Sequence, residues 1–116
     1  MPGGKLPTWD QIPNHELKAS DIPSRASSWD QIKRFAGSFH AYTAPEADRY
    51  RELAHRTRMN FLEGRKLALD GLGLGELRAV LFLHWRTLRH LYCGGEPSAE
   101  EMTYTLELIE AIRRKV

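Results

Sequence analysis

The chain has 116 residues, of which 41% are hydrophobic and 28% are charged, with 17 Lys and Arg against 15 Asp and Glu. This length suffices for one hydrophobic core, and the balanced composition excludes a disordered or nucleoprotein-like chain. Cys93 is the only cysteine, which excludes an intrachain disulfide, and no apolar run approaches the length of a membrane span. We therefore expect a cytoplasmic protein that does not enter a membrane.

The N-terminal part of the chain contains one tetrapeptide twice, because Trp-Asp-Gln-Ile occurs at 9–12 and again at 29–32. Each copy follows a hydroxyl residue in the pattern of a capping box, which starts a helix. Pro13 stops the first copy after one turn, whereas the second continues with apolar residues at helical spacing. We predict an irregular N-terminal arm over 1–27 with one aborted helical turn, followed by a helical domain over 28–116 that folds without the arm.

A second helix should begin at Thr43, which forms a capping box with Glu46, and should run to about Ala68. Its inward stripe includes Gly64 and Ala68, and arginines fill much of its remaining surface. A glycine-rich turn follows, and it lacks the flanking strand and the spacing of a phosphate-binding loop.

The third predicted helix, over 76–93, has the most apolar sequence and should lie at the centre of the fold. Gly94 and Gly95 end it, and Ser98 with Glu101 then caps a fourth helix that runs to the C-terminus. No segment shows a convincing strand pattern. The sequence therefore predicts an all-α protein, a small four-helix bundle with an irregular N-terminal arm.

A basic and aromatic face follows the third helix, where Arg78, Phe82, Arg86 and Arg89 are spaced by four, four and three residues and His90 lies beside them. An aromatic ring among guanidinium groups suits phosphate backbones, unstacked bases or an acidic protein surface. The alternative interpretation is a solvated basic face that covers the core with its aliphatic stems.

The preferred function is a non-enzymatic interaction, regulatory or accessory module that binds its partner through this face and through Trp9 in the arm. A protein partner or a second copy of the chain is preferred, and nucleic acid is the alternative partner. A homodimer is expected because the third helix is apolar on nearly every side, so that a second subunit would cover Phe82 or Leu83.

The histidines do not predict a metal site, because no pair has the spacing of metal ligands on one helix face. His84 lies on the apolar stripe of the third helix, where we expect a neutral imidazole that is hydrogen-bonded within the core. The sequence predicts no cofactor.

An enzymatic alternative rests on three pairs in which His follows Arg by six positions: Arg34 with His40, Arg49 with His55, and Arg78 with His84. This spacing resembles the Arg and His pair of helical ribonucleases of the HEPN type. The resemblance implies a small ribonuclease that uses Arg78 and His84 or Arg49 and His55. The polar residue that usually follows the arginine of that family is replaced here by Ala79 or Tyr50, and Arg78 and His84 point to different sides of an ideal helix.

Overall fold

The computed structural model describes residues 17–39 and 44–116, and these residues form an all-helical structure. Its elements are η3 Ala19–Asp21, α1 Trp29–Ala36, α2 Ala44–Leu62, η4 Leu69–Gly71, α3 Leu74–Tyr92 and α4 Ala99–Lys115, where η marks a single 3₁₀ turn. The predicted all-α class and the four helices are thus confirmed. Trp9, His40 and the Thr43 cap lie outside the described residues.

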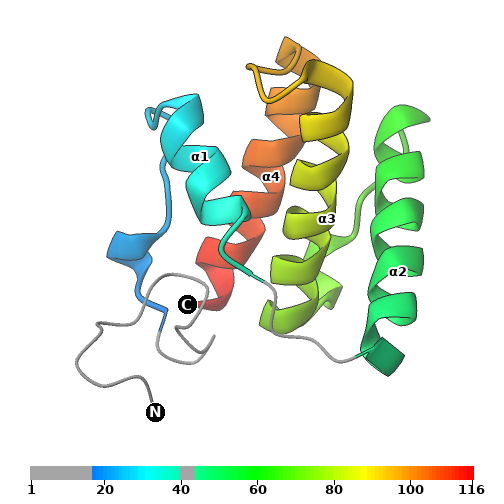
Figure 1. Ribbon diagram of the computed structural model, residues 1–116. Coiled ribbons are helices and arrows are strands. Elements are labelled where there is room, and N and C mark those ends of the chain that lie inside the picture. The colour runs from blue at the N-terminus through cyan, green and yellow to red at the C-terminus, as the bar shows by residue number, and fades with distance from the viewer. Residues whose placement is uncertain (1–16, 40–43) are drawn as a thin grey trace.

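Helix α3 lies in the middle of the molecule and contacts each of the other three helices (Figure 1). Helices α2 and α3 run in the same direction, so residues 63–73 return along the length of the molecule between them, while α1 and α4 run the opposite way (Figure 1). Among the described residues, no helix is long and apolar enough to cross a membrane.

The serines that the sequence marks as helix starts cap α1 and α4. Ser28 Oγ accepts a hydrogen bond from the Gln31 amide at 3.3 Å, and Gln31 Oε1 accepts one from the Ser28 amide at 3.0 Å, which completes the predicted capping box. Ser98 Oγ likewise accepts from the Glu101 amide at 3.3 Å. The Glu101 carboxylate, however, binds Arg58 of α2. Its side chain therefore joins two helices instead of completing a capping box.

Helix α2 ends at Leu62, six residues before the predicted end at Ala68. Gly64 has φ of 71°, its amide donates to the Phe61 carbonyl at 3.1 Å, and the Arg65 amide donates to the Asn60 carbonyl at 2.7 Å. This is the Schellman pattern, in which a glycine in the left-handed region ends a helix. The prediction that Gly64 lies within the helix was therefore wrong.

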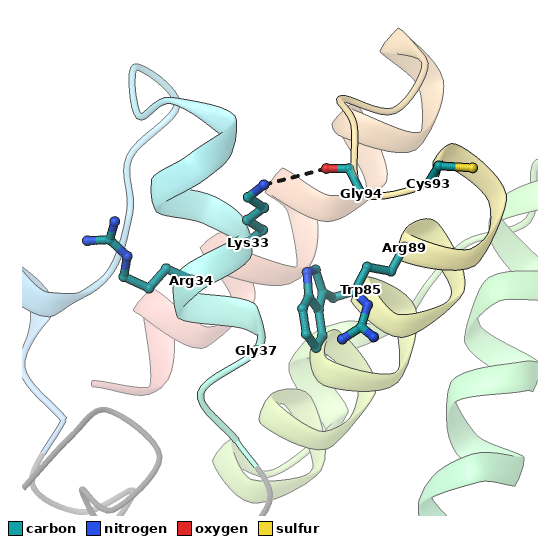
Figure 2. A pocket seen from close by; sticks show the side chains of 7 residues that line it. All are labelled: Lys33, Arg34, Gly37, Trp85, Arg89, Cys93 and Gly94. Atoms are coloured by element: carbon teal, nitrogen blue, oxygen red, sulfur yellow. Dashed lines mark hydrogen bonds between the residues drawn. The ribbon is translucent and has the colours of Figure 1, made fainter.

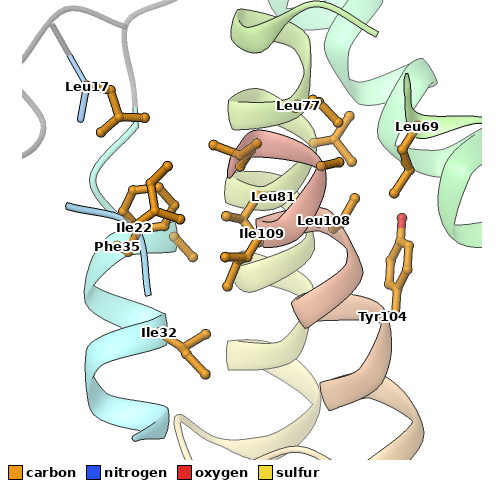
Figure 3. Close-up of a cluster of buried hydrophobic side chains, with 14 residues drawn as sticks. Leu17, Ile22, Ile32, Phe35, Leu69, Leu77, Leu81, Tyr104, Leu108 and Ile109 are labelled. Atoms are coloured by element: carbon orange, nitrogen blue, oxygen red, sulfur yellow. The ribbon is translucent and has the colours of Figure 1, made fainter. Parts of the chain in front are cut away.

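The main core cluster joins α1, α3 and α4 with the segment that precedes α1 (Figure 3). Leu17 and Ile22 are each only 5% exposed and pack in this cluster with Phe35 of α1. The Arg113 guanidinium of α4 donates to the carbonyl oxygen of Ile22 at 3.1 Å and also to that of Pro23. Residues 17–27 are thus fastened to the bundle by both apolar and polar contacts.

Candidate functional site

A ring of polar side chains lies inside the fold where α2, α3 and α4 meet. Arg58 of α2 donates two hydrogen bonds to the Glu101 carboxylate of α4, at 2.9 and 2.6 Å, and both side chains are mostly buried. Arg58 Nη1 also lies 3.4 Å from His84 Nδ1 of α3. His84 Nε2 lies 2.8 Å from the Thr105 hydroxyl, which donates to the Glu101 carbonyl at 2.8 Å. Each of the four residues is therefore hydrogen-bonded to the next, and the series that starts at the Glu101 carboxylate returns to the Glu101 carbonyl.

The direction of these hydrogen bonds fixes the tautomer of His84. The Thr105 proton is used on the Glu101 carbonyl, so the hydroxyl oxygen accepts from His84 and Nε2 carries the proton. Nδ1 is then an acceptor, which suits a donating Arg58. His84 is therefore neutral and hydrogen-bonded in the core, as the sequence predicted.

Burial also keeps His84 neutral. The side chain is 3% exposed, and burial together with the nearby positive charge of Arg58 lowers the pKa of His84 from 6.5 to about 3. Tyr104 packs edge-on against His84 with ring centroids 4.7 Å apart and stacks on Phe61 at 4.5 Å. Burial raises the pKa of the Tyr104 hydroxyl. Neither His84 nor Tyr104 changes its charge near neutral pH.

A groove of about 630 Å³ lies over this ring, between α2 and α3, and we call it the α2–α3 groove. Its cationic and imidazole side chains come from both helices, and its apolar surface comes from three aliphatic side chains. The lining residues are Arg51, Ala54, His55, Arg58, Leu83, His84, Arg86, Thr87, His90 and Leu91. None of these described residues is Asp or Glu, although Arg51 also pairs with Asp48 outside the groove.

A second groove, of about 510 Å³, lies between α1 and α3 (Figure 2), and we call it the α1–α3 groove. Its floor is the indole of Trp85, and the Arg89 guanidinium lies 5.1 Å from the centre of that ring. Its other lining residues are Lys33, Arg34, Gly37, Cys93 and Gly94. Lys33 Nζ donates to the Gly94 carbonyl at 3.5 Å, and Cys93 is an exposed free thiol. Among the described lining residues this groove also contains no carboxylate.

The structure divides the predicted basic and aromatic face into an inner and an outer part. Arg78 is 2% exposed: it donates to the Ser38 hydroxyl at 3.0 Å and lies over the rings of Phe35 and Phe39, and burial lowers its pKa to about 10. Phe82 is 9% exposed, and the Arg86 guanidinium lies 5.9 Å from its ring centre. Neither residue is open to a partner.

The outer part of that face is exposed and borders the two grooves. It consists of Arg86, Arg89 and His90. Arg86 and His90 line the α2–α3 groove, whereas Arg89 lines the α1–α3 groove. The predicted partner-binding residues thus contribute to two surfaces, on opposite sides of the exposed part of α3.

Two of the three predicted Arg and His pairs lie within the described residues, and neither pair comes together. Arg78 contacts the aromatic rings beside α1, whereas His84 contacts Thr105 of α4. Arg49 forms an ion pair with Glu76 at 3.2 Å and lies over the Tyr50 ring. His55 instead lines the α2–α3 groove.

Sequence reasoning named His55 of α2 only for the ribonuclease alternative, and it missed Arg51 and Arg58 as site residues. Arg51, His55 and Arg58 are spaced by four and three residues, which places them on one helix face, and this stripe could have been recognised. The pairing of Arg58 with Glu101 left no comparable signal, because 43 residues separate the two in the chain. Within 17–39 and 44–116, no group of three or more His, Cys, Asp or Glu side chains could hold a metal ion.

Comparisons of the chain with protein-family models, with curated proteins and with solved structures found no match.

Proposed function

We propose that the protein is a non-enzymatic interaction module that binds an acidic partner through the exposed, C-terminal half of α3. One observation carries this proposal: both grooves beside that half are lined by Arg, Lys and His, with no carboxylate among the described lining residues. Three of the lining cations, Lys33, Arg51 and Arg58, pair with carboxylates outside the lining. The positive charge that remains for a partner is that of Arg34, Arg86 and Arg89. Positive charge on a concave surface attracts anions and raises their rate of association.

The positions of the exposed arginines support the same function. Arg86 lies over the Phe82 ring and Arg89 lies over the Trp85 ring. Contacts between a guanidinium and an aromatic face restrict the side chain without using its hydrogen-bond donors. Both guanidinium groups can therefore still donate to an anion that approaches α3.

The test is binding to two polyanions, polyuridylate and a polyglutamate peptide, followed by fluorescence anisotropy at 50 and 200 mM salt. The Arg86→Glu and Arg89→Glu double variant should bind at least about tenfold more weakly than the unmodified protein. The matched control carries Arg56→Glu and Lys66→Glu, two exposed residues that line neither groove, and it makes the same change in net charge. Equal losses in both variants, or no binding of either polyanion by the unmodified protein, would contradict the proposal.

The alternative function is a small helical ribonuclease, and one observation favours it. His55 is exposed in the α2–α3 groove, where an imidazole could reach a bound phosphodiester. Two observations weigh against it: Arg49 is already paired with Glu76, and His84 is only 3% exposed and is neutral within the polar ring. We expect single-stranded RNA to remain intact when it is incubated with the protein. Cleavage that His55→Ala abolishes, in a variant that keeps its melting temperature, would establish the enzyme instead.

A further inference from the structure

The Arg and His side chains of the α2–α3 groove lie along its length, rather than around one point. Arg58 and His84 are in contact, so they mark the same level on α2 and α3. Arg51 precedes Arg58 by seven residues, or about 10 Å of helix, and His90 follows His84 by six residues, or about 9 Å. Because α2 and α3 run in the same direction (Figure 1), these two distances lie on opposite sides of the shared level. The track from Arg51 to His90 is therefore about 20 Å long.

Arginine and histidine side chains are interspersed with apolar ones along the track. Arg51 and His55 lie at one end, Arg58 and Arg86 lie near the middle, and His90 lies at the other end. Ala54 and Leu83 lie between these groups, and Leu91 follows His90. The axial repeat of about 3.4 Å per phosphate of each strand in B-DNA sets an upper limit of about six phosphates on a track of about 20 Å, and a strand laid straight along the groove places fewer there.

We propose that the α2–α3 groove binds the sugar–phosphate backbone of one nucleic-acid strand, with the bases directed to solvent. This inference rests on the proposed function, from which it takes the acidity of the partner. It adds that the partner is a nucleic-acid strand and that the strand lies in the α2–α3 groove. The phosphates accept hydrogen bonds from the exposed arginines and histidines of the groove, which are Arg51, His55, Arg86 and His90. Arg58 is already paired with Glu101 and lies in the floor. The sugars cover the aliphatic side chains.

The donor and acceptor inventory of the groove favours a strand of nucleic acid over an acidic peptide. Arginine only donates hydrogen bonds, and the Thr87 hydroxyl already donates to the Leu83 carbonyl at 3.1 Å. A peptide that lay along the groove would bring its own backbone N–H groups against these donors and leave them without acceptors. A phosphodiester backbone carries only acceptors and avoids this cost.

The groove also favours a backbone contact over recognition of bases. None of its described lining residues is Phe, Tyr or Trp, so it provides no aromatic platform on which a base could stack. A duplex is too wide for the space between two packed helices, whose axes are typically 8–10 Å apart. The groove therefore selects one strand and does not distinguish its sequence.

Fluorescence anisotropy with a fluorescein-labelled oligothymidylate of 12 nucleotides tests the inference, because DNA resists ribonuclease cleavage. An abasic strand with the same phosphates should bind within about threefold of it, and the 12 bp duplex and a 12-residue polyglutamate peptide should bind more weakly. Arg51→Gln with Arg86→Gln removes two contacts and should reduce the slope of log affinity against log salt by about 1.4. That change corresponds to about a 25-fold loss at 0.1 M salt.

The matched control is Arg34→Gln with Arg89→Gln, which removes the same charge from the α1–α3 groove. We expect it to cost less than about threefold. If this control loses as much as the first variant, or if polyglutamate binds more tightly than oligothymidylate, the inference is wrong while the acidic partner of the proposed function stands. If the abasic strand fails to bind while oligothymidylate binds, bases are recognised and the inference is also wrong. If neither polyanion binds, both proposals fail.

Discussion

On the side of α3 that faces α1, the packing is mostly apolar, whereas the side that faces α2 combines apolar contacts with a closed ring of buried polar groups. Leu17, Ile22 and Phe35 pack in the main core on the first side, and even the buried Arg78 lies over aromatic rings. The second side holds the closed ring formed by Arg58, Glu101, His84 and Thr105.

The difference between the two sides shows how the side chains at the bottom of a groove lined by cations can be held in one geometry. Buried charged groups cost free energy unless every one of them is paired, and a fully paired network holds its members in one geometry. The ring on the α2 side satisfies Arg58 from within the protein, so that guanidinium stays in place beneath the exposed Arg51 and Arg86. The floor on the α1 side is the indole of Trp85, which is held by ring contacts with Phe82 and Arg89.

The largest expected effect is a loss of stability when apolar contacts on the α1 side are removed. A chain that begins at Ser28 loses Leu17 and Ile22, whose burial contributes about 4 kcal/mol together. We therefore expect this shortened chain to unfold at a much lower urea concentration than the full chain, although the sequence alone predicted that 28–116 folds by itself. The full chain carrying Leu17→Ala and Ile22→Ala should show a similar loss. An unchanged midpoint for the shortened chain would mean that the two anchors contribute nothing.

The next largest effect is a loss of stability when the Arg58–Glu101 ion pair on the α2 side is broken. Glu101→Ala leaves the mostly buried Arg58 without its carboxylate, and we expect a loss of about 3 kcal/mol in the free energy of unfolding. Glu100→Ala, at the exposed neighbouring position, is the control and should cost less than about 0.5 kcal/mol. Adding Arg58→Met to Glu101→Ala should recover part of the loss, because the unpaired charge is gone. Equal costs for the two glutamates would show that the ion pair does not support the fold.

A change of pH should affect the α2 side only. The pKa of His84 in the folded protein is about 3 and lies below its unfolded value of about 6.5, so the unfolded state binds the proton more readily. The contribution of His84 to stability is complete above pH 6.5 and is lost as the pH falls toward 3. Between pH 7 and 5 the loss from this residue is about 2 kcal/mol.

Urea unfolding at pH 7 and pH 5 measures that loss as the difference between the unmodified protein and His84→Gln. His55→Gln is the control, because it removes an exposed histidine and should leave the dependence on pH intact. Nitrogen NMR should show a proton on His84 Nε2 and none on Nδ1 at pH 5. A doubly protonated His84 at pH 6 would contradict the closed ring.

The smallest expected effect distinguishes the two groove floors. A Cβ atom on Gly37 would lie 3.0 Å from Trp85 Cη2 and 3.1 Å from the Lys33 carbonyl oxygen, so Gly37→Ala must displace the indole. We expect a cost of about 1 kcal/mol in urea unfolding and no change in the affinity for oligothymidylate. Gly71→Ala, where no atom lies within 4 Å of the new Cβ, is the control for stability. A loss of affinity in the Gly37 variant would place the bound strand on the α1 side.

Much of the fold could be predicted from the sequence because its signals are local. The Ser28 and Ser98 caps and the apolar stripe of α3 depend on residues within a few positions of one another, and the structure confirms them. The end of α2 was predicted wrongly because Gly64 fits an apolar stripe as well as it fits a helix end. Only the left-handed backbone at that residue decides between the two.

The candidate site was harder to predict, because its parts are distant in the chain. Arg78 and Arg86 share one spacing pattern, yet the first is buried against α1 and the second is exposed. Nothing within α3 distinguishes them, since burial depends on which helix packs on each side. The role of Glu101 was missed for the same reason. Its place in the capping signature of α4 was predicted correctly, but its carboxylate binds Arg58 of α2.

The most direct test of the account is an NMR titration of the isotope-labelled full-length protein with the abasic phosphate strand. If the α2–α3 groove binds the backbone, the amide signals of Arg51, His55, Arg86 and His90 should shift together and saturate at one strand per chain. The signals of Lys33 and Trp85, in the α1–α3 groove, should change little. Shifts that concentrate at Lys33 and Trp85 while Arg51 and His55 stay unchanged would contradict the central claim.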